Sequence, residues 1–251
     1  MTAVIKEQTQ PDQKQDVTGI LQRSLMFSDM GADILQPLVE AATLQIVPKG
    51  KILFVHEEKA EFFYVIVSGW VKLFRETLNG EEAVIDVRNS GHVFGEMAIF
   101  GHDFYDYGAE VVEPAVLVTI PLAILRRLVE ANTQISMQIF RLMSQAHRLQ
   151  IGELEHRSVQ NAPQRIGCFL LRLCKPGDEG PITLHLPYDK TLIASRLGMK
   201  AETFSRALAR LRRETGIRTN GGSVEIDAVS QLSQYSCAAC SSSYPCQDLP
   251  R

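Results

Sequence analysis

The feature that most constrains the fold of this 251-residue chain is a series of short β-type segments between residues 43 and 120, with no helical pattern between them. Each segment is rich in β-branched and aromatic residues, and turn signals separate the segments. Asn79-Gly80 is the strongest signal, because this pair suits a two-residue hairpin turn, and Ser68-Gly69 is another. Many short strands at near-regular spacing predict an antiparallel sandwich or barrel. The segments read LQIV, KILFV, FFYVIV, WVKLF, AVIDV, VVE and AVLVTI.

Helical spacing precedes and follows the β-rich region. We expect disorder in the polar residues 1–16, helix over 17–42, and a sensor domain that covers residues 17–121. A long helix is predicted over residues 122–157, with a break near Asn132. Its apolar residues follow a 4,3,4,3 spacing, which is that of a dimeric coiled coil; packing of the same stripe on the chain's own barrel is the alternative, and we favour a mixture of both. The stripe consists of Ile135, Ile139, Leu142, Ala146 and Leu149.

The last third of the chain, residues 158–236, has the pattern of a helix–turn–helix. Asn161 is a candidate N-cap, with a proline in the first turn of the helix that follows. Two helical segments then occur in the stretch DKTLIASRLGMKAETFSRALARLRR, and Gly198 separates them. The sequence IRTNGGSVEI predicts a hairpin that would form a wing beside the second helix. The alternative to a DNA-binding motif is a helical hairpin with a solvated basic face.

The second helix of this motif would enter the major groove of DNA with its N-terminal residues on the base edges. Arginine can bond guanine with two donors and glutamate can accept from cytosine, so Glu202, Thr203, Ser205 and Arg206 are candidates for base contacts. Cationic side chains around them are placed for phosphates. They are Lys200, Arg210, Arg212 and Arg213 on the helix and Arg218 on the wing.

The net charge of −3 is unevenly spread along the chain. Residues 160–236 hold eleven Lys and Arg against seven Asp and Glu, while residues 1–159 carry about −7. A basic segment behind an acidic one is typical of a protein of which one part meets nucleic acid. No nucleophile–base constellation, phosphate-binding loop or H-E-x-x-H motif indicates an enzyme. No apolar run is long enough to span a bilayer and the N-terminus lacks a signal-peptide core, so we expect a cytoplasmic protein without a membrane partner.

These motifs together resemble the CRP/FNR family of dimeric bacterial transcription regulators. The resemblance rests on FFYVIVSGWVKLF and GHVFGEMAIF in the β-rich region, RLMS in the long helix and LGMKAETFSRAL in the DNA-binding part. It implies an α+β fold with an N-terminal cyclic-nucleotide-binding-type antiparallel β-roll (jelly roll), a long dimerisation helix and a C-terminal winged helix–turn–helix. It also implies three partners, namely palindromic double-stranded DNA, RNA polymerase and a second copy of the chain.

The run E-T-x-S-R is similar to that of the FNR-like branch of the family. In that branch the residues that match Glu202, Ser205 and Arg206 read a TTGAT-type half-site. The branch that reads TGTGA has an arginine where this chain has Ala201.

The segment that binds cAMP in some members of the family differs in this chain. Those members carry an Arg-Ser pair that clamps the cyclic phosphate, and Tyr107-Gly108 stands at that place here. A charged, bidentate guanidinium has no neutral substitute, so we expect no cAMP binding even though Gly95 and Glu96 are present. The alternative is a cyclic-nucleotide-binding module without DNA function. Such a module would lack the winged helix–turn–helix pattern, which this chain has.

The C-terminal tail, residues 237–251, contains Cys237, Cys240 and Cys246 at C-x2-C-x5-C spacing. In reducing cytosol such clusters usually serve metal or redox chemistry. By resemblance to cluster-bearing members of the family, we expect a [4Fe–4S] cluster that is sensitive to oxygen or nitric oxide. The alternatives are zinc, a thiol–disulfide switch or incidental cysteines. Candidates for a fourth ligand are Cys168, Cys174, His147, His156 or a carboxylate, although inert buried thiols are the default for Cys168 and Cys174.

Haem is the other gas-sensing cofactor that the resemblance suggests. Candidate ligands lie in or beside the β-region: His56, His92, His102 and Met97. A lone histidine is more often hydrogen-bonded or on the surface than a ligand, so haem ranks below the cluster. A regulator that responds to haem or to another small effector, without a cluster, is the alternative function.

Overall fold

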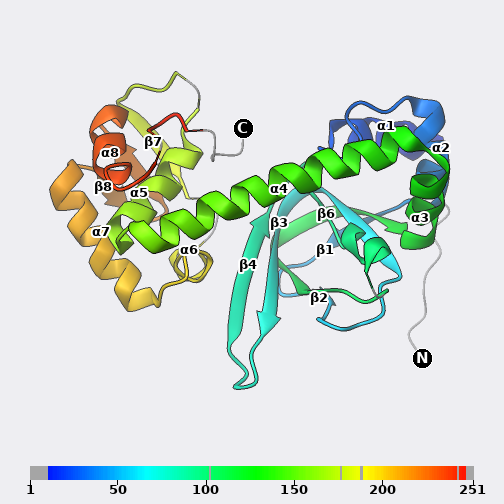
Figure 1. The fold of residues 1–251 in the computed structure, drawn as a ribbon, viewed down its shortest axis with the longest axis horizontal. Coiled ribbons are helices and arrows are strands. Elements are labelled where there is room, and N and C mark those ends of the chain that lie inside the picture. Colours follow the sequence, from blue (N-terminus) through cyan, green and yellow to red (C-terminus); the bar gives the residue numbers. More distant parts are fainter. Residues whose placement is uncertain (1–10, 102, 176, 187–188, 242, 247–251) are drawn as a thin grey trace. The chain divides into compact units, whose positions relative to one another are not determined.

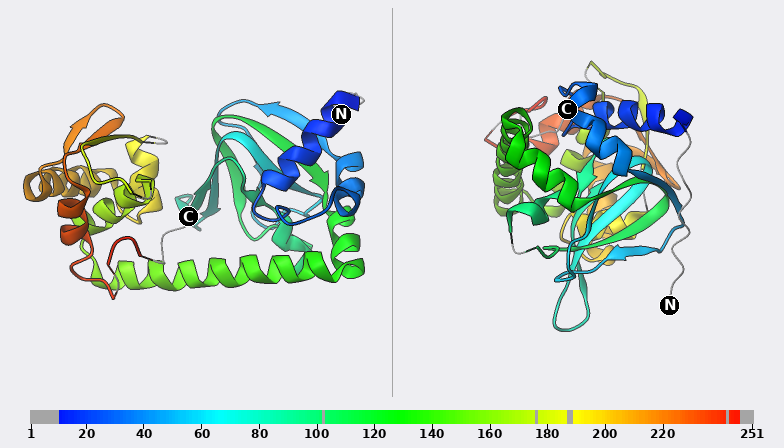
Figure 2. Two further views of the ribbon diagram at one scale, coloured as in Figure 1. Left: turned by 90° about the horizontal axis from the view of Figure 1, so that it is seen from above. Right: turned by 90° about the vertical axis from the view of Figure 1, so that its right-hand side faces the viewer.

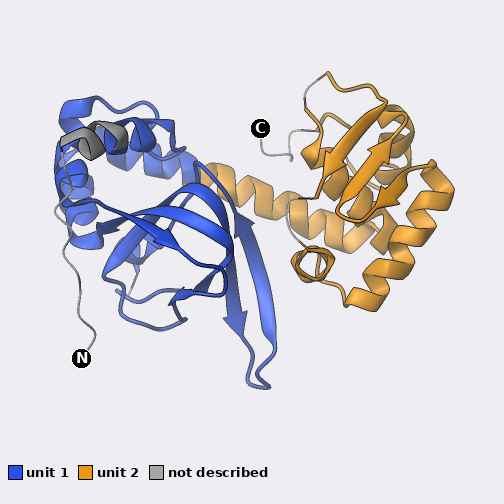
Figure 3. Ribbon diagram, turned by 180° about the vertical axis from the view of Figure 1, so that it is seen from behind, with its two compact units in different colours: residues 1–142 blue, residues 143–251 orange. Residues whose placement is uncertain are grey.

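The computed structural model describes residues 11–101, 103–175, 177–186, 189–241 and 243–246, with side chains described from residue 17 on. The chain divides into two compact units, Met1–Leu142 and Met143–Arg251 (Figure 3). This division falls inside the long helix, earlier than residue 158, where the sequence places the start of the DNA-binding part. No helix in the described ranges is long and apolar enough to cross a membrane.

The first unit is built on an antiparallel sheet of six strands that curls into a roll (Figure 1). The strand order is β1-β6-β3-β4, with β2 paired to β6 and β5 paired to β3. The Asn79-Gly80 hairpin that joins β3 to β4 is where the sequence predicted it, and Figure 1 shows this hairpin projecting from the roll. The strands are β1 (Thr43–Val47), β2 (Ile52–Phe54), β3 (Phe62–Glu76), β4 (Glu82–Arg88), β5 (Val93–Phe94) and β6 (Gly108–Pro121).

The turn predicted at Ser68-Gly69 is wrong, because β3 runs through it as one strand. The pairing of β3 with β6 shifts register around these residues, and Gly69 has a φ of +87°. A Cβ on Gly69 would clash with the backbone of Pro114 on β6. Glycine is therefore required here by a bulge and a close approach of two strands rather than by a chain reversal.

Helices cover one end of the roll, as Figure 2 shows. They are α1 (Pro11–Arg23), α2 (Ala32–Ala41), the 3-10 helix η1 (Glu96–Phe100) and α3 (Leu122–Ala131). Leu21, Phe27 and Leu35 are fully buried with Phe63 of β3 in the core that these helices share with the sheet. Disorder was expected for residues 1–16; residues 1–10 lie outside the described ranges, and α1 begins at Pro11, since proline suits the first position of a helix.

The long helix α4 (Thr133–Val159) starts at the break that the sequence predicted. The side-chain oxygen of Asn132 accepts hydrogen bonds from the backbone N–H groups of Gln134 (2.9 Å) and Ile135 (3.3 Å). An asparagine side chain that satisfies the first free N–H groups of a helix is an N-cap, and it fixes where α4 begins.

Part of the predicted stripe of α4 packs on its own unit, as in the alternative that the sequence left open, and its role in a dimer stays a prediction. Ile135 and Ile139 are buried in the core of their own unit, so neither side chain is available to a partner. Leu142 packs partly on the same core, whereas Ala146 is exposed and Leu149 is partly buried. Another stripe of α4 faces away from that core with the same 3,4 spacing, and its apolar members are exposed. This exposed stripe consists of Met137, Phe140, Ser144, His147, Ile151 and Leu154.

The second unit contains a small helical core and a three-stranded antiparallel sheet in the order β7-β9-β8. Asn161 caps α5 as predicted, in a reciprocal capping box with Gln164. The helix α8, which the sequence did not predict as an element, packs against α5. The elements are α5 (Ala162–Leu173), β7 (Ile182–His185), α6 (Lys190–Arg196), α7 (Ala201–Thr215), β8 (Arg218–Asn220), β9 (Ser223–Ile226) and α8 (Val229–Ser236). The antiparallel β-roll, the long helix and the C-terminal helix–turn–helix confirm the predicted fold class.

Candidate recognition helix and cysteine site

The turn between α6 and α7 is fixed by short-range interactions. The carboxylate of Asp189 accepts the backbone N–H of Leu192 (2.9 Å) and so caps α6. Gly198 ends α6 in the left-handed region (φ +66°), and Gly216 ends α7 in the same way (φ +69°). These two glycines set the length of α7 and the angle at which the chain enters it.

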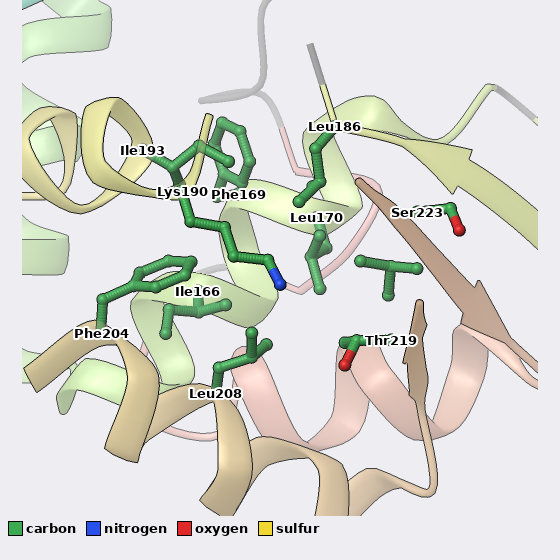
Figure 4. Close-up of a pocket in the computed structure, with 11 residues that line it drawn as sticks. Ile166, Phe169, Leu170, Leu186, Lys190, Ile193, Phe204, Leu208, Thr219 and Ser223 are labelled. Atoms are coloured by element: carbon green, nitrogen blue, oxygen red, sulfur yellow. The ribbon is translucent and has the colours of Figure 1, made fainter. Parts of the chain in front are cut away.

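One side of α7 is anchored in the core of the second unit. Phe204, Leu208 and Leu211 are buried among residues of α5, α6 and the wing. Figure 4 shows Phe204 and Leu208 on one side of a small, mostly apolar hollow, with the side chain of Lys190 reaching toward its centre. The hollow has room for about one water molecule, so the packing holds α7 without leaving space for an effector there.

The opposite side of α7 carries the predicted base-contact residues, and all of them are exposed. Glu202 and Arg206 are one helical turn apart, with 3.6 Å between carboxylate and guanidinium, and their side chains are 89% and 77% exposed. The hydroxyl of Ser205 donates to the backbone carbonyl of Ala201 (3.0 Å), while Thr203 is exposed beside them. Exposed pairs of this kind are weak, so both charged groups can exchange each other for a base edge.

The cationic residues around α7 differ in their surroundings. Lys200, Arg212 and Arg213 are exposed, and Arg210 lies 4.0 Å from Glu214. Arg218 on the wing is held differently: its guanidinium donates two hydrogen bonds of 2.7 Å to Asp227 and one of 3.0 Å to Glu225. The two carboxylates raise the pKa of Arg218, and together they carry more negative charge than the guanidinium carries positive charge. Arg218 is therefore the weakest of the predicted phosphate contacts.

The cysteine tail is fastened to the second unit. The side-chain amide of Gln160 donates to the Cys240 sulfur (2.9 Å) and to the carbonyl of Ser236 (3.3 Å). The carboxylate of Glu155 accepts hydrogen bonds from the backbone N–H (2.7 Å) and the hydroxyl (2.9 Å) of Ser241. The end of α4 and the residue after it therefore hold the tail in place.

The five cysteines are all reduced in this structure. Cys168 is buried on α5, with 3.9 Å between its sulfur and Nδ1 of His156. Burial raises the pKa of the Cys168 thiol to about 11, and the thiols of Cys246, Cys237 and Cys240 lie close enough to contribute to the rise. Burial likewise raises the pKa of Cys174 to about 11, but the charge that acts on this thiol is that of Asp178. The three tail thiols, and not that of Cys174, therefore lie within electrostatic range of Cys168.

These thiols do not converge on a single point. In the described ranges no three His, Cys, Asp or Glu side chains are arranged to hold one metal ion. Cys237 is partly buried at the C-cap of α8, and Cys240 and Cys246 are also partly buried. The predicted ligands are thus near one another but not at the spacing of a single-ion site.

The β-roll holds a second feature of interest, around the segment that follows β5. Tyr107 projects over this segment, and its hydroxyl accepts the backbone N–H of Gly95 (3.0 Å). Tyr105 stacks on Phe54 with 3.6 Å between ring centroids. The hollow between these side chains and Met97 has no room for a water molecule.

Glu96 is buried beside this hollow, and one of its carboxylate oxygens has no hydrogen-bond partner. Burial raises the pKa of Glu96, while the charge of Arg88 acts in the opposite direction. The guanidinium of Arg88 is itself engaged by Asp86 and by the carbonyl of Val93.

Comparison with known proteins decides the family. Residues 44–132 match the cyclic nucleotide-binding domain model and residues 164–235 match the Crp-like helix-turn-helix domain model. A solved structure from Ruegeria pomeroyi, named for cyclic-nucleotide binding, is 34% identical, covers 90% of this chain and 99% of its own, and superposes with a TM-score of 0.62. The chain belongs to the CRP/FNR family of transcription regulators.

Curated relatives of this CRP/FNR regulator include proteins with different names. A cyclic AMP receptor protein of Thermus thermophilus is 28% identical over 194 residues, which is 76% of this chain and 86% of that protein. A fumarate and nitrate reduction regulatory protein of Shigella dysenteriae is 27% identical over 195 residues, which is 75% of this chain and 78% of that protein. The matched families and relatives are regulators of transcription that bind DNA, and not enzymes.

The described β-roll of this CRP/FNR protein does not fit a cyclic nucleotide. Tyr107 fills the hollow and engages Gly95, and the Arg-Ser pair is absent from the segment. The unpartnered oxygen of Glu96 is the one buried polar atom here that a ligand hydroxyl could satisfy, but the hollow beside it has no space for a ligand. That cAMP does not bind stays a prediction.

Two of the candidate haem ligands engage other residues of the roll. His56 is in hydrogen-bonding contact with Arg75, and Nδ1 of His92 lies 3.2 Å from the carbonyl of Asn89. Met97 lines the closed hollow, and His102 lies outside the described residues. That haem ranks below the cluster stays a prediction.

Three residues that make long-range contacts in the second unit were not identified from the sequence. Glu155 and Gln160 bind the cysteine tail, and Glu153 forms ion pairs with Arg172 on α5 (3.2 Å) and Arg196 on α6 (2.7 Å). Each acts on residues between 19 and 86 positions away, so no local pattern in the sequence could reveal its role.

Proposed function

We propose that this protein is a dimeric, sequence-specific regulator that reads TTGAT-like half-sites and responds to oxygen, redox state or nitrogen oxides through a C-terminal iron–sulfur cluster. The observation that supports specific reading is the exposed set Glu202, Ser205 and Arg206 on the first turns of α7, above a buried anchor. Residues there reach base edges when such a helix enters the major groove. The regulator acts on RNA polymerase once it is bound to its site.

The test of specific reading is a fluorescence-anisotropy titration with a labelled TTGAT-N4-ATCAA duplex. Tight binding to this duplex is expected, with at least tenfold weaker binding to a TGTGA palindrome and to a scrambled duplex of equal length. Glu202→Ala and Arg206→Ala should each weaken specific binding by about 10–100-fold, since a lost base contact costs about 1–3 kcal/mol. Arg157→Ala, which removes an exposed arginine of α4 outside this surface, is the matched control. Specific binding that survives in both recognition variants contradicts the assignment.

A second copy of the chain is expected to pack on the exposed stripe of α4. Met137, Phe140, Ile151 and Leu154 present apolar surface at heptad spacing, and that pattern is typical of a dimer seam. A two-fold dimer would place two copies of α7 on two half-sites of a palindrome.

We expect the tail cysteines to hold an iron–sulfur cluster. Cys237, Cys240 and Cys246 would hold it, because thiolates are the usual ligands of such clusters and the tail is fastened beside the core of the second unit. When bound, the cluster would supply sensitivity to oxygen and nitric oxide. Protein purified without oxygen should show a broad absorbance near 400 nm with iron and acid-labile sulfide, lost in air and in Cys237→Ala. Colourless, iron-free protein would refute this part of the proposal.

A further inference from the structure

Glu153 lies near the end of α4 and binds two other helices of the second unit through one carboxylate. The guanidinium of Arg196, in the last turn of α6, donates to both carboxylate oxygens, with 2.7 Å from Nη2 to Oε1 and 3.3 Å from Nη1 to Oε2. The guanidinium of Arg172, in the last turn of α5, donates to Oε1 over 3.2 Å. One carboxylate therefore ties α4 to both α5 and α6.

The contact between Glu153 and Arg196 has the geometry and the surroundings of a strong ion pair. Its two hydrogen bonds fix the plane of the guanidinium as well as its distance, which a single contact does not do. The side chains of Glu153 and Arg196 are only 25% and 17% exposed. Solvent and salt therefore screen this contact less than they screen an ion pair on the surface. The pair is thus able to hold α6 at a fixed position on α4.

The helix α6 leads directly into the recognition helix. Only a short turn separates Arg196 from α7, and in this turn the backbone N–H of Met199 donates to the carbonyl of Ala194 (2.9 Å). Ile193 of α6 is buried in the same core as Phe204 of α7. The position of α6 on α4 therefore determines the position of α7, and with it that of the predicted base contacts.

Another side of α4, at the same level, carries part of the exposed stripe. Ile151 and Leu154 are 53% and 63% exposed. At 3.6 residues per turn, Glu153 lies about 160° around the helix axis from Ile151. In the proposed dimer the two apolar residues meet the second copy, while Glu153 binds α6. A single turn of α4 thus connects the dimer seam to the helix–turn–helix.

We propose that Glu153 is a positioning residue that determines the half-site spacing at which the dimer binds DNA. This inference rests on the proposed function and adds the selection of spacing to it. One extra base pair between two half-sites moves one of them by about 3.4 Å and turns it by about 35°, so a dimer that holds its two α7 helices rigidly prefers one spacing. Glu153 acts through Arg196 and α6, and not by contact with DNA.

The test measures the binding of full-length protein to duplexes in which three, four or five base pairs separate two TTGAT half-sites. In fluorescence-anisotropy titrations the wild type should bind the four-base-pair spacing about tenfold more tightly than the other two. In Glu153→Gln this preference should fall to about threefold or less, because α6 is no longer fixed on α4. Arg196→Gln removes the same contact from the other side, so it should show the same loss and replaces Glu153→Gln should that variant fail to fold.

A second readout separates positioning from base reading. A duplex with a single TTGAT half-site needs only one copy of α7, so its binding does not depend on spacing. The preference for this duplex over a scrambled one should be the same in Glu153→Gln as in the wild type, since Glu202 and Arg206 are unchanged.

Arg172→Gln is the matched control. It removes an arginine from the same carboxylate but leaves both hydrogen bonds between Arg196 and Glu153 in place. It should keep the preference of about tenfold for the four-base-pair spacing. An equal loss of this preference in Arg172→Gln would show that the contact with α6 does not determine the spacing, and would overturn the inference.

The remaining outcomes separate this inference from the function on which it rests. If Glu153→Gln only destabilises the fold, its affinities for the three spacings fall together and their ratios stay those of the wild type, which overturns the inference. A wild type that reads TTGAT but binds all three spacings equally also overturns it and leaves base reading intact. A wild type that does not distinguish TTGAT from scrambled half-sites refutes the proposed function and the inference with it.

Discussion

Ile139 and Phe140 are consecutive residues of α4, yet Ile139 is 2% exposed and Phe140 is 65% exposed. One faces the core of its own unit and the other faces away from it, so the two side chains have separate roles. A large exposed aromatic at heptad spacing is expected to be covered by a partner.

Phe140→Glu is expected to shift the protein from dimer to monomer. A charge at an apolar position of the seam is buried without a partner when the dimer forms, and that costs several kcal/mol. Sedimentation velocity at micromolar concentration measures the shift, and circular dichroism should show that the monomer keeps the helix and strand content of the wild type.

Ile139→Ala is the matched control on the other face. It should lower the free energy of unfolding by about 2–4 kcal/mol, because it leaves a cavity in the core, without a direct effect on association of the folded protein. A monomer from Ile139→Ala, together with a dimer from Phe140→Glu, would show that the stripe first predicted from the sequence is the seam after all.

The salt dependence of DNA binding should separate Lys200 from Arg218. Lys200 is exposed and is placed for a phosphate, so Lys200→Ala should lower the slope of log Kd against log salt by about 1. Arg218→Ala should leave the slope unchanged, because Asp227 and Glu225 already engage its guanidinium. Titrations at four salt concentrations measure both slopes, and an equal loss of slope in the two variants would contradict this distinction.

A fall in pH should destabilise the fold of the second unit, because it protonates the carboxylate of Glu153. Burial acts to raise the pKa of its carboxyl, but the hydrogen bond and charge of Arg196, together with Arg172, outweigh burial and lower it. Because the pKa of Glu153 is lower in the folded than in the unfolded state, its carboxylate stabilises the fold at pH values above the unfolded-state pKa of about 4.3. That contribution is lost as the pH falls through the folded-state pKa.

At pH 7, Glu153→Gln should therefore have a free energy of unfolding about 1–2 kcal/mol lower than that of the wild type, after allowance for partial exposure. It should also unfold at a lower temperature. The difference between the two proteins should shrink as the pH falls below 4. Thermal unfolding followed by circular dichroism from pH 7 to pH 3 measures it. If the difference in stability between the two proteins stays constant over this range, the ion pairs of Glu153 with Arg172 and Arg196 do not contribute to the stability of the fold.

Local signals predicted the elements well where a single residue sets a boundary. Asn161 caps α5, Asn132 starts α4 and Gly198 ends α6, and each was readable because capping depends on the adjacent backbone alone. Gly69 misled the prediction, since a glycine that a bulge requires looks in the sequence like one that a turn requires.

The choice of faces on α4 could not be settled from the sequence. Apolar residues follow heptad spacing on two stripes of the helix, one through Ile135 and Ile139 and the other through Met137 and Phe140. Which stripe meets the chain's own core depends on where the β-roll and α1 lie, and spacing carries no information on that. The position of Cys168 beside the tail likewise depends on a helix contact between residues far apart in the chain.

The measurement that tests the central claim most directly is the DNA affinity of protein purified without oxygen, before and after exposure to air, on the TTGAT-N4-ATCAA duplex. The wild type should change its Kd by at least tenfold on exposure, and Cys237→Ala should show no change because it lacks the group that air destroys. A wild type that binds this duplex with the same Kd in both states would contradict a redox-responsive regulator, however well it recognises the sequence.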